Sequence, residues 1–141
     1  MLNQLRECKI LLDSSVLLQI YEGIDVFELI NQEVGKCGYY VLDCIIKELN
    51  KISTSSKGFK GRAARLALDY LGKRDVEVIT TDLCDLPGDE SMIQFFKMNP
   101  TARNSFIVAT NDGGLKKELL KLGVKVLTWW SSKFRYVVLT P

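Results

Sequence analysis

The sequence predicts an α/β fold in which helices cover both faces of a mostly parallel sheet, and three observations support it. Apolar stretches of strand character alternate with segments whose apolar residues recur at helical spacing, an order typical of βαβ units. The 141 residues match the size of one ordinary domain. The composition, 47% hydrophobic and 26% charged, is that of a globular protein. We therefore expect residues 1–141 to form a single domain, a three-layer α/β/α sandwich.

About five apolar segments are expected to form the central sheet, with a short sixth strand at one edge. The first, residues 9–13, is an apolar run that ends in an acid, as expected of a strand buried on both faces. The other strands are expected, in chain order, at residues 39–42, 76–79, 106–110 and 125–127, with the edge strand at 136–139.

The helices are expected between these strands. Residues 16–35 carry apolar side chains at helical spacing that is broken near Gly23, and the alanine-rich segment 63–71 is a strong helix former. Further helices are expected at residues 44–52, 89–98 and 114–122. Residues 53–61 are mostly Ser, Thr, Gly and Lys, so we expect a mobile surface loop there.

Histidine and cysteine usage restricts the chemistry. The absence of histidine excludes a Ser-His-Asp triad, a Cys-His dyad, an imidazole base and a His-ligated zinc. The four cysteines form no C-x-x-C motif, so we expect reduced, largely buried thiols in a cytoplasmic protein. No apolar run is long enough to cross a membrane, and no signal segment is expected. An enzyme of this composition would need carboxylates, hydroxyls, lysines or a bound metal.

Acidic residues follow four of the predicted strands. Asp13 ends the first strand, Glu48 lies one helical turn beyond the second, Asp89 and Glu90 begin the helix after the third, and Asp112 follows the fourth. The carboxyl ends of parallel strands meet at one edge of a sheet, so these acids should converge. Converging carboxylates repel one another unless a cation lies among them. Oxygen ligands of this kind suit Mg²⁺ or Mn²⁺, which promote hydrolysis of phosphate esters.

Each acid also has an ordinary structural interpretation. Asp89 and Asp112 could simply cap helices, and Glu48 could be a solvated charge on a helix face. Asp43 is better explained as a cap than as a ligand. Asp13 is harder to explain in this way, because it ends the most apolar strand and should be partly buried. The convergence of four junctions, and no single residue, favours the metal site.

The order of these motifs resembles that of the PIN domain (PilT N-terminus) family of metal-dependent ribonucleases, over about residues 8–128. Residues 10–15 resemble its first motif, Glu48 its second acid, the pair Asp89–Glu90 its third motif, and residues 106–112 its fourth. The chain looks most similar to small stand-alone members related to VapC toxins and to ribosomal-RNA processing nucleases.

The resemblance implies a Mg²⁺- or Mn²⁺-dependent ribonuclease. It implies metal ligands at Asp13, Glu48, Asp112 and either Asp89 or Glu90, with Ser14 and Asn111 orienting water or the ligand carboxylates. Two positions depart from the family pattern: Glu90 stands where Asp is usual, and a Gly-Gly pair follows Asp112. These departures leave open an inactive or weakly active RNA-binding or assembly factor with the same fold.

The net charge of +2 conceals a basic segment. Residues 47–65 contain six lysines and arginines and one acid. We expect the following residues to contact single-stranded or looped RNA, the cations through phosphates and the aromatic ring by stacking on a base: Lys51, Lys57, Phe59, Lys60, Arg62 and Arg65. A solvated loop and helix face is the alternative.

Partners other than RNA are suggested by less specific features. Trp129 and Trp130 suit a homodimer or partner surface and suit core packing equally well. The family resemblance implies an antitoxin or a ribosome-assembly protein as a candidate partner, and no membrane partner is expected. A phospho-accepting signalling domain is disfavoured, because it needs paired acids on the first strand, whereas Leu12 precedes Asp13.

Overall fold

The computed structural model describes residues 8–141 and contains one six-stranded sheet with the order β3-β2-β1-β4-β5-β6. Residues 1–7, which the expected domain includes, lie outside the described residues. The strands are β1 (Lys9–Leu12), β2 (Gly38–Leu42), β3 (Val76–Ile79), β4 (Phe106–Ala109), β5 (Lys125–Trp130) and β6 (Arg135–Leu139). All neighbouring strands are parallel except β5 and β6, which form an antiparallel hairpin. The predicted mostly parallel sheet and its edge strand are confirmed.

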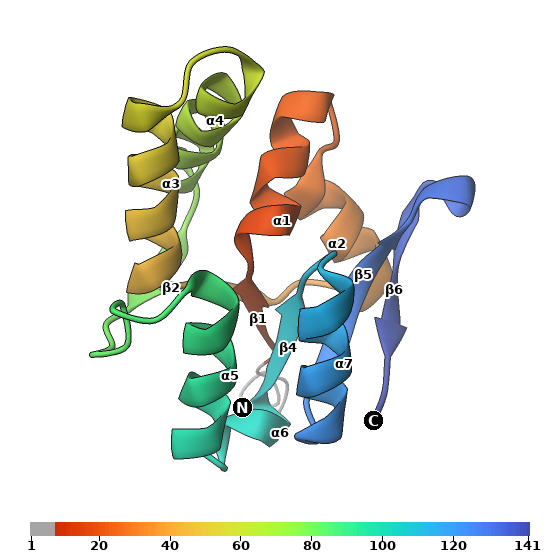
Figure 1. Ribbon diagram of the computed structural model, residues 1–141. Helices are drawn as coiled ribbons and strands as arrows, with labels where there is room; N and C mark the ends of the chain where they lie inside the picture. The colour runs from red at the N-terminus through yellow and green to blue at the C-terminus, as the bar shows by residue number, and fades with distance from the viewer. Residues whose placement is uncertain (1–7) are drawn as a thin grey trace.

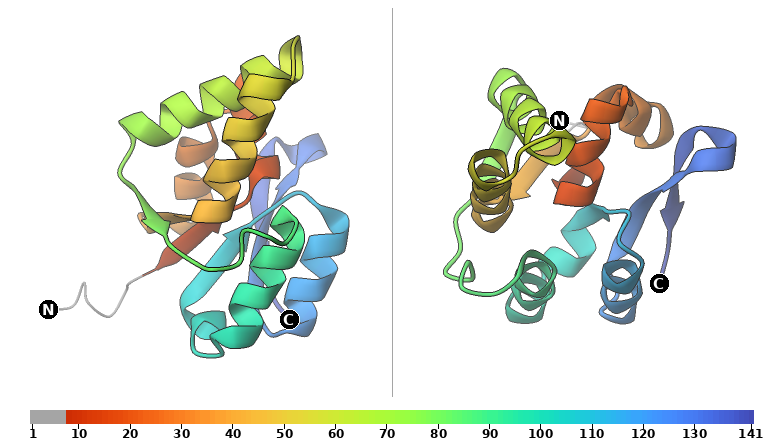
Figure 2. Two further views of the ribbon diagram at one scale, coloured as in Figure 1. Left: turned by 60° about the vertical axis from the view of Figure 1, so that its left-hand side comes forward. Right: turned by 45° about the horizontal axis from the view of Figure 1, so that its top comes forward.

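Helices cover both faces of this sheet, as predicted. In chain order they are α1 (Ser14–Leu17), the 3₁₀ helix η2 (Leu18–Glu22), α2 (Val26–Val34), α3 (Asp43–Ser55), α4 (Phe59–Lys73), α5 (Gly88–Met98), α6 (Ala102–Ser105), α7 (Gly113–Lys121) and the 3₁₀ helix η3 (Ser131–Lys133). Helices α5 and α7 lie side by side on one face, and α1, α2 and α4 lie on the other (Figures 1 and 2). No helix in residues 8–141 is long and apolar enough to span a membrane.

The core lies between these layers and fixes the central strand. Ile10, Leu11 and Leu12 of β1 have no exposed surface, because β1 is flanked by β2 and β4 and covered from both sides. Burial on both faces explains why this strand is a continuous apolar run. The chain therefore leaves the core at Asp13, immediately after β1.

The predicted loop at residues 53–61 is wrong, because only residues 56–58 separate α3 from α4. The hydroxyls of Ser53, Thr54 and Ser55 donate hydrogen bonds of 2.6 to 3.2 Å to backbone carbonyls at the end of α3. Such bonds let short polar side chains continue a helix that their composition would otherwise end. The basic residues after this segment are consequently held on a helix.

The expectation of reduced thiols is also wrong. Cys8 is bonded to Cys37, and Cys44 is bonded to Cys84, with Cα–Cα distances of 4.8 Å in both pairs. Spacings of 29 and 40 residues gave no signal of these pairs, which form because β2 lies between β1 and β3 in the sheet. The cytoplasmic location rested partly on free thiols, so it loses that support and stays a prediction.

The fifth strand is longer than the predicted 125–127 and ends with the two tryptophans, which take different roles. Trp129 is partly buried and packs edge-to-face on Phe134 and Tyr136, with ring centroids 5.0 and 4.9 Å apart. Trp130 is 45% exposed near the tip of the projecting β5–β6 hairpin (Figure 1). Core packing therefore accounts for the first ring only, and a partner surface at the second stays a prediction.

Candidate functional site

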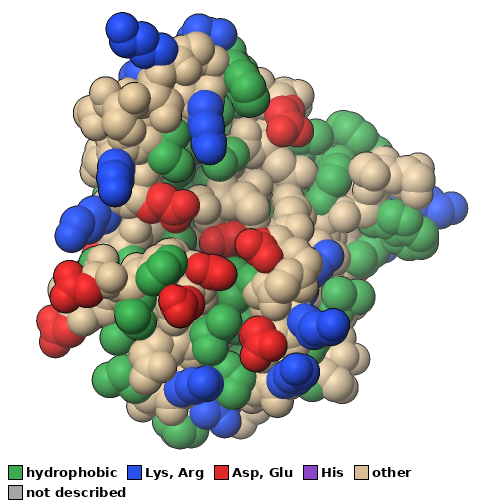
Figure 3. Space-filling view, viewed as in Figure 1, with side chains coloured by type: hydrophobic (Ala, Val, Ile, Leu, Met, Phe, Trp, Pro, Cys, Tyr) green, Lys and Arg blue, Asp and Glu red, His purple; other side chains and the backbone are tan. Residues whose placement is uncertain are grey.

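The carboxyl ends of β1, β2 and β4 meet at one edge of the sheet, where α1, α3 and α7 begin. Acidic side chains gather near the centre of the face that includes this edge, and basic side chains lie over α3 and α4 (Figure 3). The arrangement follows from the parallel topology, since every parallel strand delivers its carboxyl end to the same side.

Asp13 is the most buried acid of this edge, with 6% of its surface exposed. Its Oδ2 accepts hydrogen bonds from the hydroxyls of Ser15, at 2.6 Å, and Thr110, at 2.8 Å, and it caps α1 through the backbone N–H of Ser15. All three bonds use the same oxygen. Within residues 8–141 the carboxylate is therefore fixed through Oδ2, and Oδ1 is left for a ligand.

The two hydroxyls that hold Asp13 also hold the start of α7. The Ser15 hydroxyl accepts from the backbone N–H of Asn111 at 2.9 Å, and the Thr110 hydroxyl accepts from that of Asp112 at 3.1 Å. Neither Ser15 nor Thr110 was among the predicted site residues. Thr110 lies beside Asp13 because Leu12 pairs with Ala109, a register that the sequence does not reveal.

Glu48 projects from α3 toward the same place. Burial raises the pKa of Glu48 above its ordinary value, and the negative charges of Asp13 and Asp89 raise it further. A hydrogen bond from the Ser14 side chain and the positive charge of Lys60 oppose this rise. The structure thus brings together acids from three chain segments.

The start of α5 approaches Glu48 closely. A Cβ atom placed on Gly88 would lie 2.8 Å from the Glu48 Oε1, so only glycine fits without displacing that carboxylate. Asp89 and Glu90 follow at once and are exposed, and the Asp89 Oδ1 accepts from the backbone N–H of Glu90 at 3.0 Å. Of the two, Asp89 is the acid whose charge acts on the Glu48 carboxyl.

Asp112 and Asn111 follow β4 and have clear structural roles. The Oδ1 of exposed Asp112 accepts from the backbone N–H of Leu115 at 3.0 Å and so caps α7. The side-chain oxygen of Asn111 accepts from the backbone N–H of Trp129 at 3.0 Å and from the Thr128 hydroxyl at 3.4 Å. The Asn111 side chain therefore anchors β5, and its contact with the Asp13 network is made by its backbone.

The predicted RNA-contacting residues lie along α3, α4 and the short turn between them, and all are exposed. Phe59 stacks against Tyr21 of η2, with ring centroids 6.5 Å apart. The Arg62 Nε donates to the Tyr21 hydroxyl at 3.0 Å, whereas Arg65 donates to the Ser53 carbonyl at 2.8 Å. Tyr21 was not predicted to belong to this group, because it lies 38 residues before Phe59 in the chain.

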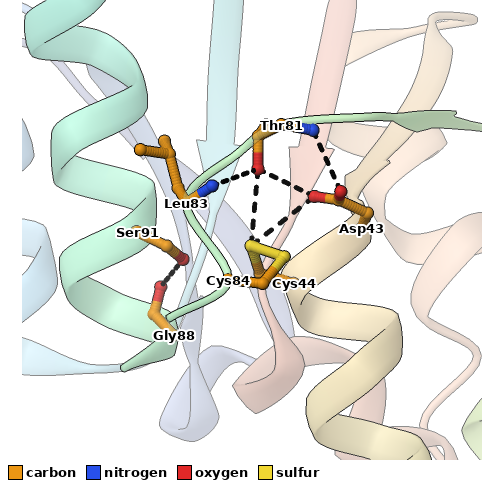
Figure 4. Close-up of a disulfide and its surroundings, with 7 residues drawn as sticks. All are labelled: Asp43, Cys44, Thr81, Leu83, Cys84, Gly88 and Ser91. Atoms are coloured by element: carbon orange, nitrogen blue, oxygen red, sulfur yellow. Dashed lines mark hydrogen bonds between the residues drawn. A yellow bond between two sulfur atoms is a disulfide. The ribbon is translucent and has the colours of Figure 1, made fainter. Parts of the chain in front are cut away.

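Asp43 ties α3 to the loop that follows β3 (Figure 4). Its two carboxylate oxygens accept from the backbone N–H and the hydroxyl of Thr81, both at 2.9 Å. The Asp43 carboxylate and the sulfurs of Cys44 and Cys84 lie within 4.8 Å of one another. Because these sulfurs are joined in a disulfide, they are not free to serve as thiolate ligands.

Comparisons with known proteins agree with this fold. A family model described as a PIN like domain matches residues 10–130. The solved structure of the PIN domain endonuclease Utp24 superposes with a TM-score of 0.74 at 21% identity, covering 94% of this chain and 92% of that one. No curated protein matches the sequence.

Proposed function

The chain belongs to the PIN-like domain family, and from this premise we propose that it is a metal-dependent endoribonuclease acting on single-stranded or looped RNA. The main support is the convergence of Asp13, Glu48 and Asp89: burial raises the pKa of Glu48, and the negative charges of the other two acids raise it further. A solved endonuclease with the same fold gives further support for nuclease activity. Perturbed carboxylates at a sheet edge are a frequent sign of a functional site.

The residues present fit a divalent cation. Their side-chain donors are carboxylate oxygens, and one oxygen of Asp13 stays unengaged within residues 8–141. Hard oxygen donors of this kind suit Mg²⁺ or Mn²⁺. We assign the ligand set to Asp13, Glu48, Asp89 and Asp112, with Glu90 as the alternative to Asp89. When bound, the cation supplies positive charge that acidifies water and neutralises charge developing on the phosphodiester.

The chain's own residues set the geometry of the proposed reaction. Ser15 and Thr110 hold the Asp13 carboxylate through Oδ2. The Ser14 side chain and the positive charge of Lys60 both favour the charged form of Glu48 and so lower its pKa. The Asp13 carboxylate is therefore fixed before any substrate binds.

The basic surface of α3 and α4 supports RNA as the substrate. Lys51, Lys57, Lys60, Arg62 and Arg65 would neutralise phosphates, while the stacked Phe59 and Tyr21 rings offer a platform for an unpaired base. This surface adjoins the acids, since Lys60 acts on Glu48. Three further partners stay predictions: an antitoxin, a ribosome-assembly protein and a second copy of the chain.

Cleavage of structured and unstructured RNA, with and without Mn²⁺, tests the proposal. We expect Mn²⁺-dependent cleavage by the wild type and a loss of at least about 100-fold in Asp13→Asn, which removes a charged ligand and keeps its size. Asp75→Asn is the matched control, because Asp75 is exposed and precedes β3 at the opposite edge. RNA binding without cleavage in either Mg²⁺ or Mn²⁺ would instead indicate a non-catalytic RNA-binding factor.

A further inference from the structure

The loop that carries the third motif is attached to the first turn of α3 in two places. One is the pair of hydrogen bonds from Thr81 to Asp43, and the other is the disulfide between Cys84 and Cys44 (Figure 4). Both lie about one helical turn before Glu48. The disulfide is the attachment nearer to α5, because only three residues separate Cys84 from Gly88.

Glu48 and the start of α5 are close but not packed together throughout. A methyl group on Gly88 would displace the Glu48 carboxylate, and Asp89 follows directly. Beside them a cleft of about 340 Å³ is bounded by Glu48 and Lys51 on one side and by Cys84 and Leu86 on the other. With open space there, side chains do not fill the gap between α3 and this loop.

We propose that Cys44 and Cys84 are positioning residues of the cation site, whose disulfide fixes the acidic start of α5 relative to Glu48. The inference rests on the proposed function, because it assumes that acids from α3 and α5 bind the same cation. A covalent bond one turn from Glu48 restricts the loop beside the cleft, nearer to α5 than the Thr81–Asp43 hydrogen bonds are. The bond therefore keeps the carboxylates close despite their repulsion.

Reduction should release this restraint. An external dithiol supplies two electrons and two protons, the bond between the two sulfurs breaks, Cys44 and Cys84 become thiols, and the dithiol becomes a cyclic disulfide. The loop then stays attached to the first turn of α3 by the Thr81–Asp43 hydrogen bonds, without a covalent bond. Cation binding should weaken, because part of the binding free energy is then used to draw the loop back.

The second disulfide provides a matched control within the same chain. Cys8 and Cys37 precede β1 and β2, at the edge of the sheet opposite to the acids. The backbone N–H of Gly38 already donates to the Cys8 carbonyl at 2.9 Å, so the two segments stay paired without the disulfide. Losing Cys8–Cys37 should lower stability and leave the cation site unchanged.

The experiment compares the full chain with Cys44→Ala/Cys84→Ala and with Cys8→Ala/Cys37→Ala. Calorimetric titration with Mn²⁺, without RNA, should give a dissociation constant about 10-fold higher for the first variant and an unchanged one for the second. Amide hydrogen exchange should be faster in residues 81–92 of the first variant only. Reducing Cys8→Ala/Cys37→Ala with dithiothreitol should reproduce the first variant, and reoxidation should restore wild-type binding.

Two results would overturn the positioning role: unchanged Mn²⁺ affinity and exchange in Cys44→Ala/Cys84→Ala, or free thiols at both positions in aerobically purified wild type. Saturating Mn²⁺ should restore the RNA cleavage rate of the folded variant, which a general loss of structure would not allow. Failure of the proposed function is distinguishable, because the wild type itself would then bind no Mn²⁺ and cleave no RNA.

Discussion

Asp13 is a buried acid with one hydrogen-bonded carboxylate oxygen and, within residues 8–141, one oxygen that accepts no hydrogen bond. Its Oδ2 accepts from two hydroxyls on different elements, and those hydroxyls in turn accept from the backbone at the start of α7. Ser15 and Thr110 thereby couple the position of Asp13 to that of Asp112. The sequence indicated Asp13 as a buried acid but could not show which hydroxyls hold it.

The Thr110 hydroxyl can be removed with little change in side-chain shape. Thr110→Val should weaken Mn²⁺ binding about 10- to 100-fold, since it deletes the hydrogen bond that orients the ligand carboxylate. It also leaves the backbone N–H of Asp112 without its acceptor, which should cost about 1–3 kcal/mol in unfolding free energy. Thr110→Ser, which keeps the hydroxyl, should retain most of both properties; equal Mn²⁺ affinity in Thr110→Val and wild type would contradict this role.

The raised pKa of Glu48 predicts a stability effect with a definite sign. When a carboxyl group has a higher pKa in the folded than in the unfolded state, the protein becomes less stable as the pH rises from the ordinary pKa of 4.5 through the raised pKa. Glu48→Gln should therefore stabilise the metal-free protein at pH 7, and the gain should vanish below about pH 4. Thermal unfolding of both proteins in EDTA across this range measures it. A gain that persists at low pH would have another cause.

At the scale of elements, the spacing and the number of apolar residues along the chain predicted every strand of the sheet. The loop predicted at residues 53–61 is wrong because side-chain hydroxyls continue a helix that the composition indicates should end. The short helix α6 was also not predicted, since four residues contain too little periodic signal. Helix α4 consequently starts at Phe59 and presents the aromatic ring and cations from a rigid element.

This placement gives Phe59 and the neighbouring lysines separable roles in RNA binding. Phe59→Ala should weaken binding of an unstructured RNA about 5-fold or more at every salt concentration, because stacking contributes about 1–3 kcal/mol per base. Lys57→Gln should instead reduce the salt dependence, through the loss of about one phosphate contact. Fluorescence anisotropy in EDTA measures both. Met98→Ala, at an exposed apolar side chain ending α5, is the control; an equal loss there would indicate no specific stacking.

For the whole molecule, the strand order explains why acids distant in sequence converge. The chain adds β2 and β3 on one side of β1 and then crosses to add β4 and β5 on the other. Asp13 lies at this switch point, where ligands bind in open α/β sheets. The alternation of strands and helices predicted that the acids meet at one edge of the sheet. The disulfide pairs and the positions of Tyr21 and Thr110 depend on strand order and register, which apolar patterns do not encode.

The origin of the oxygen added to the RNA product tests the central claim most directly. Without histidine, the proposed carboxylate site should cleave by attack of water and not of the ribose 2′-hydroxyl. Single-turnover cleavage in ¹⁸O-labelled water with Mn²⁺ should place one ¹⁸O in the terminal phosphate of the product, and Asp13→Asn should give no product. Cyclic 2′,3′-phosphate ends, or equal cleavage in EDTA, would contradict the account.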